Sequence, residues 1–365
     1  MDKFGFVKLK DVCNINMGQS PDSDSYNDNE DGIPFFQGNA DFGEKYPTTR
    51  KWCNAPTKIA HAEDILISVR APIGALNYAK EECCIGRGLA AITPNQDKVS
   101  SGFIYWLLKG KHKELNLQGT GSTFKAISRK VLEEIKVPDI ELKKQTELAG
   151  SLEKVYSVIQ LRKQQLEELD ILIKARFVEM FGTLQNPALE FKRDALKNLC
   201  FKITDGKHGG CKAEEGTERY FVGAREIYDD EIHYDTAPEI NVDEFEKDYK
   251  RCNVEIGDFL IVNTGATIGK SAIAMDERTT HTLLQKSVAL LKIDPEVLNP
   301  VFLKWCYRVN TSMYMVESAS AQPNLLLSKI NVTEIYVPDL ELQNQFADFV
   351  IQVDKLKFVE TIAKF

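Results

Sequence analysis

The sequence contains a repeat of itself, and this repeat limits how the chain can fold more than any other feature. Residues 128–145 (SRKVLEEIKVPDIELKKQ) align with residues 328–345 (SKINVTEIYVPDLELQNQ) without a gap, at an offset of 200 residues and with nine identities. More loosely, residues 62–68 resemble residues 256–262, and an Ile-Gly pair follows each within a dozen positions. The period far exceeds the roughly 20–50 residues of solenoid repeats. We therefore expect a duplicated domain with pseudo-twofold symmetry.

Each copy combines short apolar runs with loop-forming segments. Residues 64–68 (DILIS) and 258–262 (DFLIV) are short, apolar and rich in β-branched side chains, which is typical of buried strands. Clusters of Gly, Asn, Asp and Pro between such runs predict long loops. The fold class expected is therefore mixed α/β (α+β), with two repeated globular domains. Asp139 and Asp339, each directly after a proline, are predicted to cap the helices that follow.

A long helix is predicted over residues 140–181, which contain no proline and end before Gly182. At 1.5 Å per residue it would be a rod of roughly 60 Å. A second helix begins in the same way after residue 339 and stops about 17 residues short of its twin. We expect the two to pack as an antiparallel coiled coil. The first predicted seam is Leu148, Leu152, Val155, Ile159, Arg162, Leu166, Leu169, Ile173, Arg176 and Met180, and the second contains Leu342, Phe346, Val350, Val353 and Leu356. The two arginines are expected to pair with acids on the partner helix, such as Asp354 or Glu360.

These patterns divide the chain into four parts: residues 1–139, 140–182, 183–338 and 339–365. The net charge is −8, and residues 183–338 carry 18 positive and 24 negative side chains. This balance argues against nucleic-acid binding by bulk charge alone. No apolar run reaches the roughly 18 residues of a membrane span, and eight cysteines without a CxxC pair predict reduced thiols. We therefore expect a cytoplasmic protein.

The order of the motifs resembles the specificity subunit of type I restriction–modification systems. The motifs that carry the resemblance are Gly18-Gln19-Ser20-Pro21 with residues 32–36 (GIPFF), residues 68–74 (SVRAPIG), residues 121–127 (GSTFKAI) and the alternative start at residues 204–208 (TDGKH). No single motif is specific, but their duplicated order, with a long helix after each copy, covers essentially the whole chain.

This resemblance implies that residues 1–139 and 183–338 are target recognition domains, each reading one half of a split, asymmetric site in double-stranded DNA. It implies that the helices set the spacing between the halves and dock methyltransferase subunits, which we expect to number two. Those subunits would bind S-adenosylmethionine and methylate adenine, and restriction subunits using ATP and Mg would join them. The chain itself would do no chemistry and carry no cofactor. The short second helix would weaken docking at its end.

Reading a base sequence requires side chains that donate to or accept from base edges, and candidates occur in glycine-flanked loops. In the first copy they are Gln19, Ser20, Gln37, Asn39, Arg70, Arg87, Ser122, Thr123 and Lys125. In the second they are Lys207, His208, Arg225, Thr264, Lys270, Gln322, Asn324 and Lys329. Phosphate contact is the expected role of Lys125, Lys270 and Lys329. Helix pairing or partner docking is assigned to Leu148, Leu152, Val155, Ile159, Leu166, Leu169, Ile173, Phe346, Val350 and Val353.

Two alternatives stay open. Residues 138–143 (PDIELK) superficially spell a PD…ExK nuclease, although only one residue separates the two acids and Gln343 stands at the aligned position of Lys143. A helix cap explains this segment better. The chain could also be a silent specificity subunit, truncated at Phe365. No catalytic residue and no metal site are predicted, and the five histidines lack ligand spacing.

Overall fold

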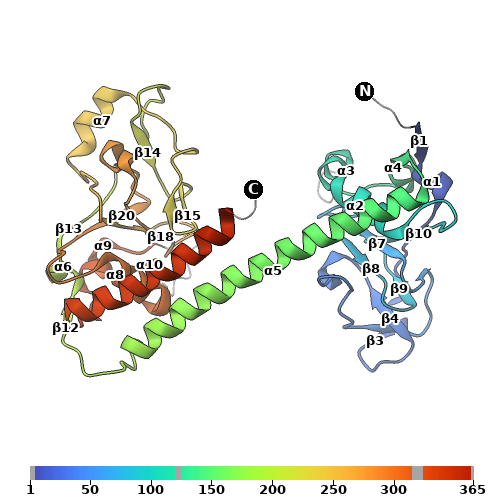
Figure 1. Cartoon of the computed structure of the whole chain (residues 1–365), viewed down its shortest axis with the longest axis horizontal. Coiled ribbons are helices and arrows are strands. Elements are labelled where there is room, and N and C mark those ends of the chain that lie inside the picture. Colours follow the sequence, from blue (N-terminus) through green and yellow to red (C-terminus); the bar gives the residue numbers. More distant parts are fainter. Residues whose placement is uncertain (1–4, 121–124, 315–323, 363–365) are drawn as a thin grey trace. The chain divides into compact units, whose positions relative to one another are not determined.

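The computed structural model describes residues 5–120, 125–314 and 324–362, with side chains as far as residue 357. The chain forms two compact units, unit 1 over Met1–Leu161 and unit 2 over Arg162–Phe365. Helix α5 (Leu142–Phe181) gives its first half to unit 1 and its second half to unit 2 (Figure 1). Each unit is described by itself below.

Unit 1 is built on a four-stranded sheet with the order β2-β10-β7-β8, beside a five-stranded sheet with the order β3-β5-β4-β9-β6. A separate pair, β1 and β11, joins the start of the unit to the segment before α5. The strands are β1 (Gly5–Lys8), β2 (Cys13–Met17), β3 (Tyr26–Asn27), β4 (Ile33–Phe36), β5 (Trp52–Cys53), β6 (Ile59–Ala60), β7 (Ile65–Ser68), β8 (Leu76–Tyr78), β9 (Cys83–Ile85), β10 (Leu89–Pro94) and β11 (Lys136–Asp139). The helices are α1 (Leu9–Val12), α2 (Ser101–Gly110), α3 (His112–Gln118) and α4 (Arg129–Glu133), with 3-10 turns η1 (Ser23–Ser25) and η2 (Asn39–Asp41).

Unit 2 repeats the four-stranded sheet and the separate strand pair of unit 1, but the pairs β14–β19 and β15–β16 stand in place of the five-stranded sheet. Its four-stranded sheet has the order β13-β20-β17-β18, and β12 pairs with β21 as β1 pairs with β11. The strands are β12 (Arg193–Ala195), β13 (Cys200–Asp205), β14 (Tyr220–Val222), β15 (Ile227–Tyr228), β16 (Glu231–Ile232), β17 (Phe259–Val262), β18 (Ser271–Ile273), β19 (Thr282–Leu284), β20 (Val288–Ile293) and β21 (Glu334–Tyr336). The helices are α6 (Leu196–Leu199), α7 (Val242–Tyr249), α8 (Pro300–Val309), α9 (Leu327–Val332) and α10 (Leu340–Ile362), with 3-10 turns η3 (Glu277–His281) and η4 (Thr311–Met313).

The two buried strands predicted from the sequence are confirmed as β7 and β17. Every residue of both is buried, because each strand lies inside its sheet between two antiparallel neighbours. The mixed α/β class is likewise confirmed. All eight cysteines are free and six of them are buried, as the absence of a CxxC pair predicted.

The structural repeat runs two residues out of register with the sequence repeat. In unit 1 the Gln145 side chain accepts from the Ser100 N–H (2.9 Å) and donates to the Ile140 carbonyl (2.8 Å). In unit 2 the same bonds are made by Gln343, with the Asn299 N–H (2.9 Å) and the Pro338 carbonyl (2.8 Å). The equivalent of Gln145 is therefore Gln343, an offset of 198 residues.

The gap-free alignment had instead matched Gln145 with Gln345, which is exposed. The strand pairs agree with the structural offset. The Leu9 N–H donates to the Ile135 carbonyl and the Leu196 N–H to the Thr333 carbonyl. The alignment at 200 residues was therefore wrong as a guide to equivalent positions, because each helix begins where its polar and apolar side chains fit the unit beneath it.

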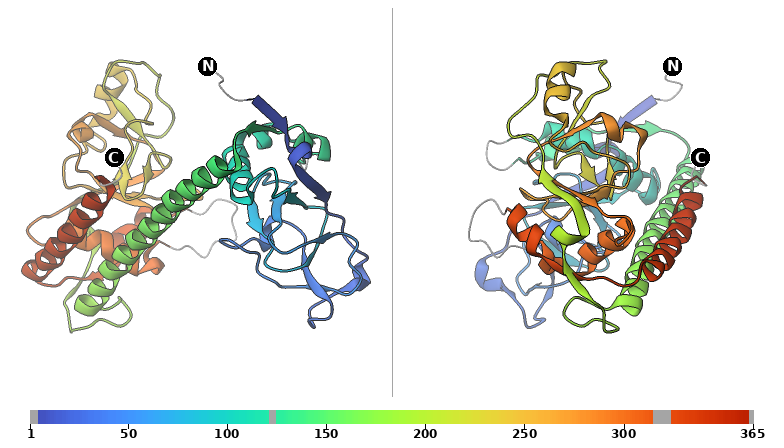
Figure 2. Two further views of the ribbon diagram at one scale, coloured as in Figure 1. Left: turned by 45° about the vertical axis from the view of Figure 1, so that its right-hand side comes forward. Right: turned by 90° about the vertical axis from the view of Figure 1, so that its left-hand side faces the viewer.

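Within unit 2, the second half of α5 packs antiparallel to α10 (Figures 1 and 2). Phe346 lies near Phe177 and Phe181, at ring distances of 5.2 and 5.7 Å. Further along, the Lys357 ammonium bonds to Asp170 at 2.7 Å. The residue numbers rise on one helix as they fall on the other, so the predicted antiparallel pairing is confirmed for this part.

The seam itself needs correction at two places, and the first is Leu356, which was predicted to belong to it but is exposed. Ile173, Phe346, Val350 and Val353 are buried as predicted, and Leu166, Leu169 and Met180 are half-buried. The buried residues beyond Ile173, however, are Phe177 and Phe181, while Arg176 pairs with Glu179 on its own helix at 2.7 Å. The buried positions Ile173, Phe177 and Phe181 are spaced by four residues. Because four residues exceed one 3.6-residue turn, the buried stripe shifts around the helix and leaves the strict 4,3 seam as α5 enters the core of unit 2. The expected pairing of Arg176 with the partner helix was wrong for the same reason.

The first half of α5 belongs to unit 1, where a different face is buried. Gln145 and Ala149 face the unit, and the Tyr156 ring contacts Trp106 at 5.3 Å. The predicted seam residues lie beside this face and stay exposed. The exposed fractions of Leu148, Leu152, Val155 and Ile159 are 41%, 45%, 58% and 42%. Their assignment to helix pairing or partner docking stays a prediction.

The ends of the helices follow local backbone chemistry. Gly182 has φ 72°, and a Cβ there would lie 2.3 Å from the Asn186 carbonyl oxygen, so only glycine fits the turn predicted to end α5. Asp139 was predicted to cap α5 but lies in β11, opposite Gly5. Asp339 directly precedes α10 and takes part through its carbonyl oxygen, which accepts from the N–H groups of residues 342 and 343. In the part of the chain that the structure describes, no helix has the length and apolar character needed to cross a membrane.

Candidate nucleic-acid interface

In each unit the candidate residues lie in loops that are held by the same pattern of backbone hydrogen bonds. We call this pattern the backbone frame. Gly18 directly follows β2, and its N–H donates to the Leu89 carbonyl at 2.9 Å. Gly206 directly follows β13, and its N–H donates to the Val288 carbonyl at 3.2 Å. A Cβ on either glycine would come within 2.2 Å of a neighbouring backbone oxygen, at Gly86 and Leu284 respectively. Both positions therefore require glycine.

The next bonds align further positions of the frame. The Gln19 N–H donates to the Ile85 carbonyl (3.0 Å), as the Lys207 N–H donates to the Leu284 carbonyl (2.7 Å). The residue after each of these acceptors belongs to the second loop of the frame. The N–H of residue 86 donates to the Phe36 carbonyl, and the N–H of residue 285 donates to the carbonyl of residue 222. These bonds make Gln19 and Lys207 equivalent and bring two more loops into register.

A third loop completes the backbone frame. It follows the central strand, which is β7 in unit 1 and β17 in unit 2. The Val69 N–H donates to the Gly88 carbonyl, and the Asn263 N–H donates to the Ser287 carbonyl, each at 2.9 Å. Arg70 then forms a β-bridge with residue 126, as Thr264 does with residue 324. The equivalent pairs are therefore Gln19 and Lys207, Ser20 and His208, Asn39 and Arg225, Arg70 and Thr264, and Arg87 and Lys286.

In unit 1 the frame surrounds a hollow of about 210 Å³, which we call the Arg70 hollow. It is lined by Gln37, Gly38, Asn39, Arg70, Ala71, Arg87 and Gly88, so it brings together four of the predicted residues. Arg70 and Arg87 are exposed. Within the described residues, neither guanidinium has a hydrogen-bond or ion-pair partner. The hollow thus presents two guanidiniums and two carboxamides, which are the groups that recognise guanine, adenine and phosphate.

In unit 2 a hollow of about 520 Å³ includes the equivalents of Arg70 and Arg87, which are Thr264 and Lys286, and we call it the Thr264 hollow. It brings together three predicted residues, His208, Thr264 and Asn324, and adds Lys286, which the sequence reading missed. The Thr264 hydroxyl donates to the Asn324 amide oxygen at 3.2 Å. The lining residues are Asp205, His208, Asn263, Thr264, Lys286, Asn324, Leu325, Leu326, Leu327 and Ser328. Aligning residues 85–92 with 284–291 would have revealed Lys286 beside Arg87.

Ion pairs inside unit 2 neutralise part of its positive charge. Lys207 lies between Asp248 (2.7 Å) and Glu244 (3.4 Å), and the hydrogen bond to Asp248 raises the pKa of its ammonium above the ordinary value. Its side chain is only 19% exposed, so little of the ammonium is left for another contact. The assignment of Lys207 to DNA binding stays a prediction. The partners are charged residues of α7, which no motif linked to Lys207.

Asp205 contacts two further side chains near this hollow. Its carboxylate lies 3.1 Å from the His208 ring and accepts from the Arg251 guanidinium. Burial raises the pKa of Asp205, but the bonds from Arg251 and His208 outweigh it, so the net pKa is lowered. His208 is therefore an exposed loop residue beside the Asp205 carboxylate.

The other predicted residues lie apart or outside the described structure. Gln19 and Arg225 are exposed on the loops next to the hollows, and Ser20 accepts a long hydrogen bond (3.5 Å) from the Arg87 N–H. Lys125 is exposed, Lys270 lies in the turn between β17 and β18, and Lys329 lies in α9. The candidates outside the described residues are Ser122, Thr123 and Gln322.

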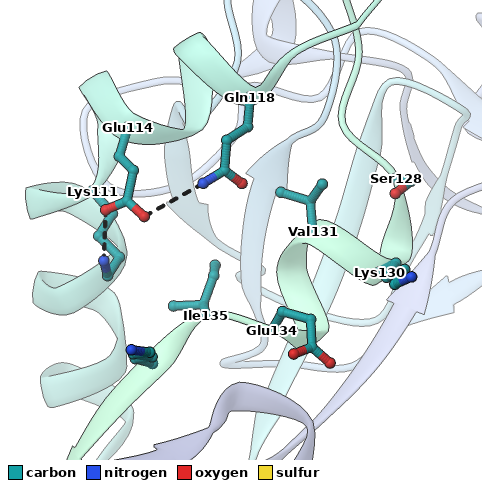
Figure 3. A pocket seen from close by; sticks show the side chains of 9 residues that line it. Lys111, Glu114, Gln118, Ser128, Lys130, Val131, Glu134 and Ile135 are labelled. Atoms are coloured by element: carbon teal, nitrogen blue, oxygen red, sulfur yellow. Dashed lines mark hydrogen bonds and ion pairs between the residues drawn. The ribbon is translucent and has the colours of Figure 1, made fainter.

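A further pocket of about 490 Å³ in unit 1 contains none of the predicted residues (Figure 3). Its charges pair locally: Lys111 bonds to Glu114 at 2.7 Å, and Glu134 bonds to Lys8 at 2.6 Å. Figure 3 shows Gln118 also pointing toward Glu114, with a hydrogen bond of 3.4 Å. Across the described residues, no group of three or more His, Cys, Asp or Glu side chains could hold a metal ion.

Comparison with known proteins assigns the fold to a family. The model of the family described as "Type I restriction modification DNA specificity domain" matches residues 1–170 and 201–364. The chain therefore belongs to this family and contains two of its domains. The resemblance found in the sequence motifs is thereby confirmed.

Particular relatives agree with this assignment. A putative type I restriction enzyme MjaX specificity subunit of Methanocaldococcus jannaschii is 43% identical over 156 residues, which are 43% of this chain and 37% of the relative. The EcoBI specificity subunit of Escherichia coli is 22% identical over 382 residues, covering 95% of this chain and 78% of that one. The solved S subunit of a type I restriction–modification system from M. genitalium shares the fold, with a TM-score of 0.58 at 14% identity over 100% of this chain and 93% of that one. The match to the first of these relatives thus spans little more than a third of its length.

Proposed function

We propose that the chain is the DNA sequence-specificity subunit of a type I restriction–modification complex. The observation that carries this proposal is that one backbone frame, built twice, presents two different sets of polar side chains. Arg70 stands where the second copy has Thr264, and Asn39 stands where it has Arg225. A duplicated frame with different donors suits two readers of unlike half-sites, so the target is a split, asymmetric sequence in double-stranded DNA.

In this proposal the chain acts in the cytoplasm and does no chemistry itself. Two methyltransferase subunits supply S-adenosylmethionine and methylate adenine, and restriction subunits supply ATP and Mg chemistry. The long helices set the distance between the half-sites and dock the methyltransferase subunits. The exposed apolar residues of the first half of α5, such as Leu152 and Val155, support a docking role because large apolar side chains in a row seldom stay uncovered.

The adenine methylome tests this function directly. Cells expressing the chain with its methyltransferase partner are compared with cells in which the chain is deleted. We expect a split, asymmetric methylated motif that disappears on deletion. In the same assay, Arg70→Ala should change or weaken recognition in one half of the motif and leave the other half intact. Methylation that is unchanged by deletion of the chain would refute the proposal, and an equal change in both halves would refute the modular reading.

A further inference from the structure

One position of the backbone frame carries a positively charged side chain in both units, Arg87 in unit 1 and Lys286 in unit 2. Arg87 and Lys286 each follow a residue whose N–H donates to the last residue of β4 or β14. Each precedes a residue whose carbonyl accepts from the residue directly after β7 or β17. Both are exposed, and within the described part of the chain neither side chain has a hydrogen-bond or ion-pair partner. Each lines the hollow of its own unit. At the other four equivalent pairs of candidate residues, the chemistry of the two side chains differs.

This pattern separates two kinds of contact. A residue that reads a base must differ between two units that read different half-sites, whereas a residue that holds the backbone can be the same in both. Guanine recognition favours the planar fork of arginine, and a lysine ammonium acts on phosphate as a point charge. Because an arginine and a lysine occupy this equivalent position, the position requires positive charge and does not require the planar guanidinium of arginine.

We propose that Arg87 and Lys286 are equivalent phosphate anchors, which hold each unit on the DNA backbone without reading sequence. Lys207, which the sequence also suggested, does not take this role because Asp248 and Glu244 neutralise it. By the same argument, the discriminating positions are those whose side chains differ between the copies, above all Arg70 and Thr264. This inference rests on the proposed function and adds the ligand group that one pair of residues contacts.

The test uses the full complex of the chain with its methyltransferase subunits. The variants are Arg87→Ala and Lys286→Ala, each measured by fluorescence anisotropy on duplexes with and without the methylated motif, over a range of salt concentrations. Losing one phosphate contact lowers the slope of log K against log salt by about 0.9. At 0.15 M salt this is about a fivefold loss of affinity. We expect the same loss on both duplexes and an unchanged methylated motif.

Matched controls come from another equivalent pair. Lys10 in α1 and Lys197 in α6 are exposed lysines that lie at the end of β2 and β13 opposite to the glycine loops. Lys10→Ala and Lys197→Ala should leave the affinity and the salt slope unchanged. The exchanges Arg87→Lys and Lys286→Arg keep the charge and should restore both. Equal thermal unfolding of all variants shows that folding is intact.

Three results would overturn the inference. The methylated motif could change at a base when Arg87 or Lys286 is replaced, which would make that residue a base reader. The salt slope could stay at the wild-type value, which would leave no phosphate contact. Arg87→Lys or Lys286→Arg could bind DNA as weakly as the alanine variant, which would show that the shape of the side chain matters more than its charge. Failure of the proposed function looks different, because the wild-type complex itself would then show no split methylated motif.

Discussion

At the scale of single residues, burial gives neighbouring side chains of α5 opposite roles. Phe177 is fully buried, and its ring contacts Phe181, Phe302 and Phe346 at 5.0–5.7 Å. Arg176, one position earlier, is only half-buried and pairs with Glu179 on the same helix. The aromatic cluster therefore anchors α5 in unit 2, while the arginine contributes little more than a surface ion pair.

Replacing these neighbours should separate the two roles. Phe177→Ala leaves a cavity and should lower the free energy of unfolding of unit 2 by about 3–5 kcal/mol. Arg176→Ala removes an i,i+3 pair worth about 0.2–0.5 kcal/mol. Denaturant unfolding is followed by the fluorescence of Trp305, which lies 6.3 Å from Phe346, after Trp52 and Trp106 are changed to phenylalanine. Equal losses for both variants would contradict the corrected seam.

At the scale of elements, one buried glutamine sets the start of each long helix. Gln343 accepts from the Asn299 N–H and donates to the carbonyls of Val297 and Pro338, at 2.9, 3.0 and 2.8 Å. It is fully buried, so its amide satisfies backbone groups that water cannot reach. The helix register therefore depends on this hydrogen-bond set more than on the identity of the surrounding residues.

The two candidate glutamines of α10 provide a direct test of the register. Gln343→Ala leaves buried backbone groups unpaired and should cost about 1–3 kcal/mol of unfolding free energy. Gln345→Ala, at the position matched by the sequence repeat, changes an exposed side chain and should stay within about 0.5 kcal/mol of the wild type. The Trp305 signal of unit 2 reports both. A larger cost at Gln345 than at Gln343 would support the offset of 200 residues instead.

At the scale of the whole molecule, charge limits what the chain can do alone. The net charge is −8. In unit 2, several cations are held by acids of the same unit, among them Lys207 by Asp248 and Lys292 by Asp258. Electrostatic attraction supplies most non-specific DNA affinity, so little is available here. The basic surface of the complex should come largely from its partners.

This predicts a sharp contrast in DNA binding. The isolated chain should bind a duplex with the methylated motif weakly at 0.15 M salt, and addition of the methyltransferase subunits should raise the affinity by at least about tenfold. Fluorescence anisotropy on a labelled duplex measures both. A duplex with a scrambled motif serves as the control for specificity. Tight binding by the chain alone would show that its own loops supply the electrostatic attraction.

Much of the fold was readable from the sequence because it depends on local patterns. The duplication, the buried strands β7 and β17, the long helix and its end at Gly182 all follow from apolar runs, periodicity and the special geometry of glycine. Four residues of the Arg70 hollow were also found, because polar side chains in glycine-flanked loops are recognisable without a partner.

Only the tertiary structure decided which of these residues work together. The offset of 198 residues, the burial of Phe177 and the neutralisation of Lys207 by α7 depend on groups far away in the sequence. The equivalence of Arg87 and Lys286 likewise appears only when backbone hydrogen bonds align the loops. The physical reason is that a local pattern states what a segment prefers, whereas burial and pairing depend on which distant segment lies against it.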